Sequence, residues 1–173
     1  MLPSFTFVLG GAASGKSVIA ENLILNSDLN PVYLATARIW DDEIQSKVDV
    51  HSARRGPEWS TINAPLDLAK PLSRAVSDQA ILLDCATMWL TNVMLDDRDV
   101  AAAQADLLKA LASCAAPVVV VSNEVGHGIV PDNALARRFR EAQGRLNIAL
   151  AAQADRVFHV VAGLTQVLKD QQR

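Results

Sequence analysis

Gly10-Gly11-Ala12-Ala13-Ser14-Gly15-Lys16-Ser17 is the stretch that decides the fold of this chain. It matches the pattern GxxxxGK followed by Ser or Thr, and it lies directly between the apolar run Phe5–Leu9 and a segment that begins Val18-Ile19-Ala20. Glycines in a strand-to-helix turn let the backbone aim its N–H groups at phosphate oxygens, and the helix N-terminus adds positive partial charge. The stretch predicts a phosphate-binding loop (P-loop) for a nucleoside triphosphate; the alternative is an ordinary glycine-rich turn.

Two side chains of this loop and one acid further along the chain are candidates for catalysis and metal binding. We expect Lys16 to hold the β- and γ-phosphates as a catalytic residue, and Ser17 to ligate Mg²⁺. A second magnesium-organising acid is expected at the end of a neighbouring buried strand, and Ala80-Ile81-Leu82-Leu83-Asp84 supplies one. The alternative is that Asp84 only caps a helix that begins near Thr87.

Strand and helix patterns alternate along the chain. Short β-branched or aromatic runs predict buried strands at Phe5–Leu9, Val32–Ala35, Ala80–Cys85, Val118–Ser122 and Arg156–Val161. Helical periodicity occupies Gly15–Asn26, Asp41–Arg55, Ala101–Ser113 and Asn133–Ala152. This alternation predicts an α/β fold of the P-loop NTPase type, with a mostly parallel sheet and helices on both faces. Gly163–Lys169 predicts a short antiparallel edge strand, and no linker divides residues 1–173, so we expect a single nucleotide-binding domain.

The overall composition disfavours several classes of function. The 173 residues carry 16 Lys and Arg against 19 Asp and Glu, a formal net charge of −3, which argues against nucleic-acid and polybasic membrane partners. The longest apolar stretch, Ala80–Leu95, contains several polar residues, so no membrane span is expected. The two cysteines, Cys85 and Cys114, lie far apart, and the start of the chain lacks a signal-peptide pattern; both features favour a reducing cytoplasm.

One histidine lies in a setting that suits covalent catalysis. In the predicted helix, Glu43, Lys47 and His51 are four residues apart and share a face. Arg54 and Arg55 follow one turn later. An imidazole between cations that could bind phosphates suits a nucleophile that forms a covalent nucleotidyl intermediate. The alternative is a solvated helix face on which His51 is a bystander.

A further polar group, Ser122-Asn123-Glu124, follows the strand predicted at Val118–Ser122. Ligands of doubly wound sheets bind at the carboxyl ends of parallel strands. We therefore expect these side chains to face the nucleotide or the substrate.

Together these motifs resemble one family, the bifunctional adenosylcobinamide kinase/adenosylcobinamide-phosphate guanylyltransferases of cobalamin biosynthesis. The P-loop is shared with many nucleotide-hydrolysing enzymes, so the resemblance depends on more particular stretches. These are Tyr33-Leu34-Ala35-Thr36-Ala37, Asp42-Glu43-Ile44 with His51 and Trp59, Leu82–Cys85 with Trp89–Asn92, and Ser122–Gly126 with Gly128–Pro131. Continued by Arg137, Phe139, Gly144, Asn147 and Gly163, they cover nearly the whole chain in the family's order.

The resemblance implies two reactions on one scaffold. ATP or GTP first phosphorylates the aminopropanol hydroxyl of adenosylcobinamide. GMP is then transferred from GTP to adenosylcobinamide phosphate, with release of pyrophosphate, through a guanylylated histidine that corresponds to His51. The family's need for Mg²⁺ and its homotrimeric assembly are implied as well.

The resemblance also carries over residues that contact the nucleotide. The triphosphate falls to Gly10, Gly11, Ala12, Ala13, Ser14, Gly15, Lys16 and Ser17. Further contacts fall to Ala35, Thr36, Ala37, Ser52, Ala53, Arg54, Arg55 and the strand-end carboxylate Asp84. Two positions depart from the family pattern: Ala13 stands where Arg is common, and Asn63 stands near a position that is commonly acidic.

Two other functions fit the residues without the resemblance. One is a kinase of another small alcohol that never uses His51 covalently, and a stable GMP adduct would argue against it. The other is a nucleotide-gated binding module, which tight nucleotide binding with little turnover would favour.

Overall fold

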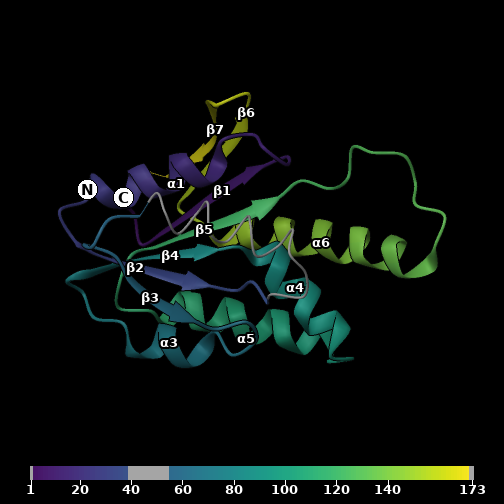
Figure 1. The fold of residues 1–173 in the computed structure, drawn as a ribbon, viewed down its shortest axis with the longest axis horizontal. Coiled ribbons are helices and arrows are strands. Elements are labelled where there is room, and N and C mark those ends of the chain that lie inside the picture. The colour runs from purple at the N-terminus through teal and green to yellow at the C-terminus, as the bar shows by residue number, and fades with distance from the viewer. Residues whose placement is uncertain (1, 39–54, 172–173) are drawn as a thin grey trace.

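The computed structural model describes residues 2–38 and 55–171. They form one seven-stranded sheet with the order β3-β2-β4-β5-β1-β6-β7, and Figure 1 shows helices on both of its faces. The strands are β1 (Phe5–Gly10), β2 (Asn30–Ala35), β3 (Ser60–Asn63), β4 (Gln79–Asp84), β5 (Val118–Asn123), β6 (Arg156–Val161) and β7 (Leu164–Asp170). The helices are α1 (Lys16–Leu25), α3 (Ala69–Arg74), α4 (Ala86–Leu95), α5 (Val100–Ser113) and α6 (Ala134–Gln153).

All neighbouring strands are parallel except β6 and β7, which form an antiparallel hairpin at the edge of the sheet. The predicted α/β fold, its mostly parallel sheet and its antiparallel C-terminal edge strand are therefore confirmed. The hairpin turns at Ala162 and Gly163, which both have positive φ. Such backbone angles fit a tight two-residue turn, where glycine is favoured.

The alternation of side chains along the strands divides the core into two layers. On one face α1 packs on Val8, Tyr33, Leu82 and Val121. On the other face α3, α4, α5 and α6 cover a larger cluster that includes Phe7, Leu34 and Leu83. Both faces of the central strands are buried, which explains their nearly continuous apolar sequences.

The carboxyl ends of the central strands meet at one edge of the sheet. Gly10 is in register with Asn123, and Ala35 is in register with Asp84. The P-loop leaves β1 at this edge and enters α1, which contacts both β4 and β5. The topology thus gathers the P-loop, Asp84 and Asn123 from segments more than 30 residues apart in the sequence.

Two short elements escaped the sequence analysis, β3 and α3. All four residues of β3 are exposed, so the strand lacks the alternation that identifies a half-buried strand. The six-residue α3 contains Pro71, a residue that breaks longer helices but is tolerated in a first turn. The helix predicted over Asp41–Arg55 falls outside the described residues, apart from Arg55.

Candidate functional site

The P-loop is held in shape by glycines and by its own lysine. The Lys16 ammonium donates a hydrogen bond of 2.9 Å to the carbonyl oxygen of Gly11. Gly15 has φ +93° at the N-cap of α1, a left-handed conformation that glycine adopts without strain. A Cβ on Gly10 would lie only 2.6 Å from the Val160 carbonyl oxygen, so β6 leaves room for no larger residue there.

The donors around this loop fit a polyphosphate. Lys16 is almost completely buried, and burial lowers the pKa of its ammonium while Cys85 and Asp84 raise it. Within the described part of the chain, the hydroxyl oxygen of Ser14 is buried and has no hydrogen-bond partner. An anion that binds beside a buried hydroxyl of this kind and a partly desolvated ammonium stabilises both groups.

Ser17 and Asp84 provide the oxygen ligands that Mg²⁺ prefers. Ser17 lies in the first turn of α1, and Asp84 ends β4. The N-cap of α4 is Cys85, whose Sγ accepts from the Met88 N–H, so Asp84 is not the cap of this helix. Burial raises the pKa of Cys85 to about 12, which keeps it a neutral thiol and a poor metal ligand.

These residues fit a magnesium ion that is bound jointly with nucleotide phosphates. In the part of the chain that the structure describes, no three His, Cys, Asp or Glu side chains cluster to hold a metal by themselves. Magnesium commonly binds through one or two protein oxygens, with phosphates and water completing the shell.

A layer of aromatic and charged side chains lies beside Asp84. The Tyr33 hydroxyl donates a hydrogen bond of 3.2 Å to Asp84 Oδ2. The Cζ of Arg55 lies 3.5 Å from the centroid of the Tyr33 ring, and Trp59 meets the same ring edge-on at 6.4 Å. The structure thus places Arg55, a predicted nucleotide contact, over the ring whose hydroxyl binds the predicted metal carboxylate. His51, Ser52, Ala53 and Arg54 lie outside the described residues.

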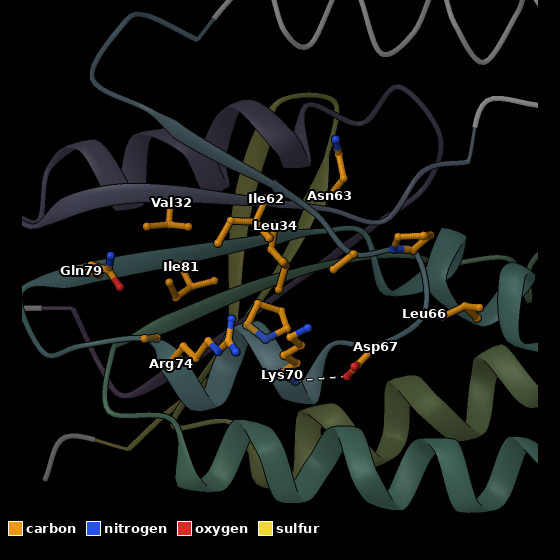
Figure 2. Close-up of a pocket in the computed structure, with 14 residues that line it drawn as sticks. Val32, Leu34, Ile62, Asn63, Leu66, Asp67, Lys70, Arg74, Gln79 and Ile81 are labelled. Carbon is orange, nitrogen blue, oxygen red and sulfur yellow. Dashed lines mark hydrogen bonds between the residues drawn. The ribbon is translucent and has the colours of Figure 1, made fainter.

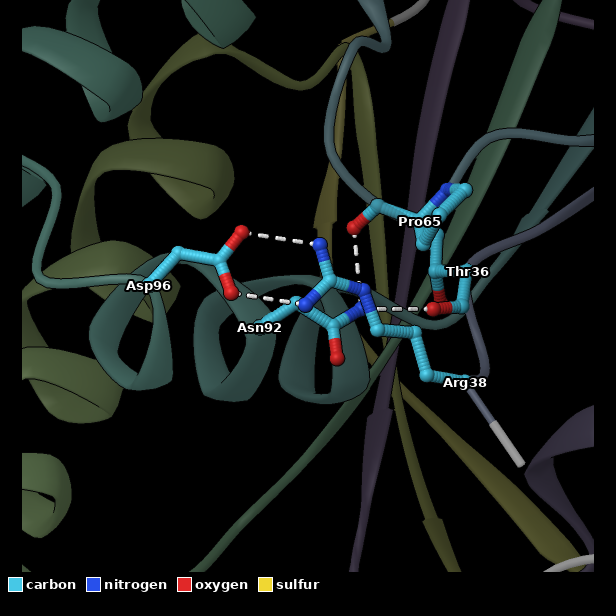
Figure 3. A network of polar contacts seen from close by, with 5 residues as sticks. All are labelled: Thr36, Arg38, Pro65, Asn92 and Asp96. Carbon is cyan, nitrogen blue, oxygen red and sulfur yellow. Dashed lines mark hydrogen bonds and ion pairs between the residues drawn. The ribbon is translucent and has the colours of Figure 1, made fainter. Parts of the chain in front are cut away.

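The segment 35–37 is anchored through Thr36 (Figure 3). The fully buried Thr36 hydroxyl accepts from the Cys85 N–H and donates to the Cys85 carbonyl oxygen, both at 2.8 Å. Asn92 donates to the carbonyl oxygens of Thr36 and Pro65. Because its side chain and backbone are engaged, Thr36 orients its neighbours Ala35 and Ala37, which are the more accessible members of the predicted contact.

A second anchor on α4 holds the next residues of this segment. Arg38 forms a two-point ion pair with Asp96, with N–O distances of 2.7 and 2.9 Å, as Figure 3 shows. Asp96 is the C-cap residue of α4, one turn after Asn92. The end of this helix therefore holds the residues on both sides of Ala37: the Thr36 carbonyl oxygen and the Arg38 side chain.

The sequence led us to expect the Ser122 side chain to face a ligand at the carboxyl edge of the sheet. The structure shows that it does not. Its hydroxyl is fully buried, donates to Asn147 Oδ1 at 2.7 Å and accepts from Gln143 Nε2 at 2.9 Å. The Asn123 N–H donates to Thr87 Oγ1, and its carbonyl accepts from Asn147. This buried polar network fixes the end of β5, so Asn123 and Glu124 alone of the three are placed to approach a ligand.

A cavity of about 560 Å³ lies between α3 and the strands β2, β3 and β4, away from the P-loop (Figure 2). Val32, Leu34 and Ile81 form its apolar wall, and Asn63 lies at one end. None of residues 10–17 lines it. This cavity is therefore separate from the predicted triphosphate site.

Tyr33 and Asn92 are members of the site that the sequence alone did not single out as functional residues. Tyr33 is the only tyrosine of the chain and interrupts the otherwise aliphatic run Val32–Ala35, a signal that could have singled it out. Asn92 is an amide in the middle of an apolar helix, and amides in such places usually bind backbone groups.

Comparisons with known proteins agree with this geometry. Residues 6–168 match the family model of cobinamide kinase / cobinamide phosphate guanyltransferase, CobU. The bifunctional adenosylcobalamin biosynthesis protein CobP of Pseudomonas aeruginosa is 41% identical over 165 residues, which cover 94% of this chain and 95% of that protein. The protein of the same description from Escherichia coli, CobU, is 38% identical over 178 residues, covering 94% and 98%.

Solved structures show the same fold at low sequence identity. The RadB recombinase has a TM-score of 0.55 at 15% identity, covering 91% of this chain and 74% of that one. A type III secretion ATPase has a TM-score of 0.59 at 11% identity, covering 98% and 57%. These likenesses concern the fold alone and confirm a P-loop NTPase architecture. By the family model and by relatives of about 40% identity over nearly the full length, the chain belongs to the bifunctional cobinamide kinases / cobinamide phosphate guanyltransferases of adenosylcobalamin biosynthesis.

Proposed function

We propose that the enzyme phosphorylates adenosylcobinamide with ATP or GTP and then transfers GMP from GTP to adenosylcobinamide phosphate. In the first reaction the substrate hydroxyl attacks the γ-phosphorus, and the nucleoside diphosphate leaves. In the second, a His51 nitrogen attacks the α-phosphorus of GTP, the bond to the β-phosphate breaks, and pyrophosphate leaves. The phosphate of the second substrate then attacks the same phosphorus, frees His51 and yields adenosylcobinamide-GDP.

The P-loop geometry supports one triphosphate site for both reactions. Lys16 and the backbone donors of residues 10–17 would hold the phosphates, while Ser17 and Asp84 would hold Mg²⁺. Bound there, Mg²⁺ would offset negative charge on the phosphate oxygens. The reactions then differ in which phosphorus is attacked, and positioning rather than a second binding site selects it.

The observation that carries the covalent step is the position of Arg55. It follows His51 by four residues, and its guanidinium lies over the Tyr33 ring beside Asp84. Its Nη1 is buried and has no hydrogen-bond partner among residues 2–38 and 55–171. A buried guanidinium donor of this kind suits a nucleotide phosphate, and His51 precedes it by only four residues in the sequence.

Labelling with GTP tests the covalent step directly. The wild-type protein and the His51→Ala variant are incubated with α-labelled GTP and Mg²⁺, denatured, and mapped by peptide. We expect an acid-labile, alkali-stable label on the wild type only, as phosphorus bonded to nitrogen requires. A label that persists in the variant would assign the nucleophile to another residue, and kinase turnover without any adduct would leave a kinase alone.

We also infer a homotrimer in the cytoplasm, as the resemblance implies. Ile129 (96% exposed) and Leu164 (75% exposed) are large apolar side chains that an assembly could cover. Both cysteines are free thiols, which agrees with a reducing compartment. No helix among residues 2–38 and 55–171 is long and apolar enough to cross a membrane. Light scattering on the purified protein measures its molar mass, and the mass of a monomer would contradict the homotrimer.

A further inference from the structure

Tyr33 makes three directed contacts from a nearly buried position in the middle of β2. Its hydroxyl donates to Asp84 Oδ2 at 3.2 Å, and one ring face carries the Arg55 guanidinium at 3.5 Å. Trp59 packs edge-on against the ring, with an interplanar angle of 81°. An aliphatic side chain could fill this part of the core, but it could make none of these contacts.

The contact with the ring leaves Arg55 able to bind something else. A cation over an aromatic face is stabilised by the ring quadrupole and keeps its N–H donors available. The Nη1 of Arg55 is buried and has no acceptor in the described part of the structure. The ring therefore holds the guanidinium in place, and the buried Nη1 is left as a donor for an anion that binds beside it.

The Tyr33 hydroxyl contacts Asp84, the predicted magnesium ligand. Asp84 ends β4, and its carboxylate can rotate about its side-chain bonds unless hydrogen bonds restrict it. The donor from Tyr33 comes from the adjacent strand β2, whose residue Ala35 is in register with Asp84. A hydrogen bond from a rigid neighbouring strand selects one orientation of this carboxylate.

We propose that Tyr33 is a positioning residue for both reactions: its hydroxyl orients the Asp84 carboxylate, and its ring holds Arg55 with its donors presented to a nucleotide phosphate. The proposal rests on the proposed function and deepens it. It makes Tyr33 the side chain that connects Asp84, the predicted magnesium ligand, with Arg55, which follows His51 in the sequence.

Two substitutions separate the two contacts. Tyr33→Phe removes the hydroxyl and keeps the ring, whereas Tyr33→Leu removes both. For Tyr33→Phe we expect the Mg²⁺ concentration at half-maximal kinase activity to rise about fivefold, since one hydrogen bond is lost. The rate of GMP labelling at saturating Mg²⁺ should stay within a factor of two. For Tyr33→Leu we expect the labelling rate to fall about tenfold as well, since Arg55 loses its support.

Phe7→Leu is the matched control for general damage to the core. Phe7 is a fully buried ring of β1 on the opposite face of the sheet, in the cluster covered by α4, α5 and α6. Its loss should lower the melting temperature and leave both the Mg²⁺ half-saturation and the labelling rate unchanged. Equal effects of Tyr33→Leu and Phe7→Leu on labelling would overturn the role of the ring, and an unchanged Mg²⁺ requirement in Tyr33→Phe would overturn the role of the hydroxyl.

A double-mutant cycle distinguishes support of Arg55 from a separate effect of Tyr33. Tyr33→Leu and Arg55→Ala should together slow labelling little more than Arg55→Ala alone, because both remove one interaction. Multiplicative effects would contradict the proposal. If wild-type protein forms no adduct while Tyr33→Phe still shifts the Mg²⁺ requirement, the covalent step of the proposed function fails and the hydroxyl role stands.

Discussion

Lys16 is a charged side chain that the fold has largely removed from water. Its ammonium bonds to the Gly11 carbonyl within the P-loop and is almost completely buried. Burial lowers the pKa of this group, so the free energy of keeping it charged is higher than at the surface. A residue kept in such a place at a cost in stability is typical of a functional site.

Replacing this lysine should separate activity from stability. We expect Lys16→Met to reduce kcat of both reactions about 100-fold or more, the usual size for loss of one preorganised electrostatic contact. Thermal unfolding should occur at the same temperature or higher, because a desolvated charge is removed. Both rates and the melting temperature are measured on the same preparations. A variant that melts several degrees lower and retains its kcat would contradict this account.

At the scale of the element, α4 acts as an anchor for the chain beyond β2. Its N-terminus follows Asp84, its Asn92 donates to the Thr36 carbonyl oxygen, and its C-cap residue Asp96 pairs with the Arg38 guanidinium. The apolar side of the same helix contributes Trp89, Leu90 and Val93 to the core. One helix therefore links the predicted metal carboxylate to the predicted nucleotide contact at Ala35 and Ala37.

The strength of this anchor can be measured at Asn92. Asn92→Leu removes the donor to the buried Thr36 carbonyl oxygen and to the partly buried Pro65 carbonyl oxygen, and we expect a loss of about 3 kcal/mol in the free energy of unfolding. Thr91→Val is the control, because the Thr91 hydroxyl donates within its own helix, to the Thr87 carbonyl oxygen. Urea denaturation of both variants decides the point; equal losses would show that Asn92 is no anchor.

At the scale of the whole molecule, the C-terminal hairpin supports the N-terminal P-loop. The Gly163 N–H donates to the Ser14 carbonyl oxygen at 2.8 Å, and a Cβ on Gly15 would lie 3.2 Å from the Gly163 Cα. Both glycines have positive φ. The turn of the last hairpin thus braces the loop from about 150 residues away in the sequence.

Two glycine substitutions should change the stability of the protein in opposite directions. Gly163→Ala should cost about 1 kcal/mol of stability, because its φ of +76° strains an alanine, and it should weaken GTP binding through the Ser14 carbonyl. Gly144→Ala in α6 meets open space and should add up to about 1 kcal/mol by helix propensity alone. Urea unfolding with and without GTP measures both effects; a stabilising Gly163→Ala would refute the brace.

Most of the fold could be predicted because local patterns and global topology agree. The apolar runs of β1, β4, β5 and β6 and the periodicity of α1, α5 and α6 were found within one or two residues of their observed bounds. The failures were β3 and α3, whose exposed or proline-containing sequences carry no strong period. The motif roles of Lys16, Ser17 and Asp84 agree with their placement, and their contacts with nucleotide stay predictions.

The sequence by itself determined the P-loop, the α/β class and the family, because these depend on residue types at fixed local spacing. Only the tertiary structure decided that Tyr33 joins Arg55 to Asp84, that Asn92 anchors Thr36, and that Gly163 braces Ser14. Each of these contacts crosses from one element to another. Their partners are fixed by strand order and register, which no short window of sequence contains.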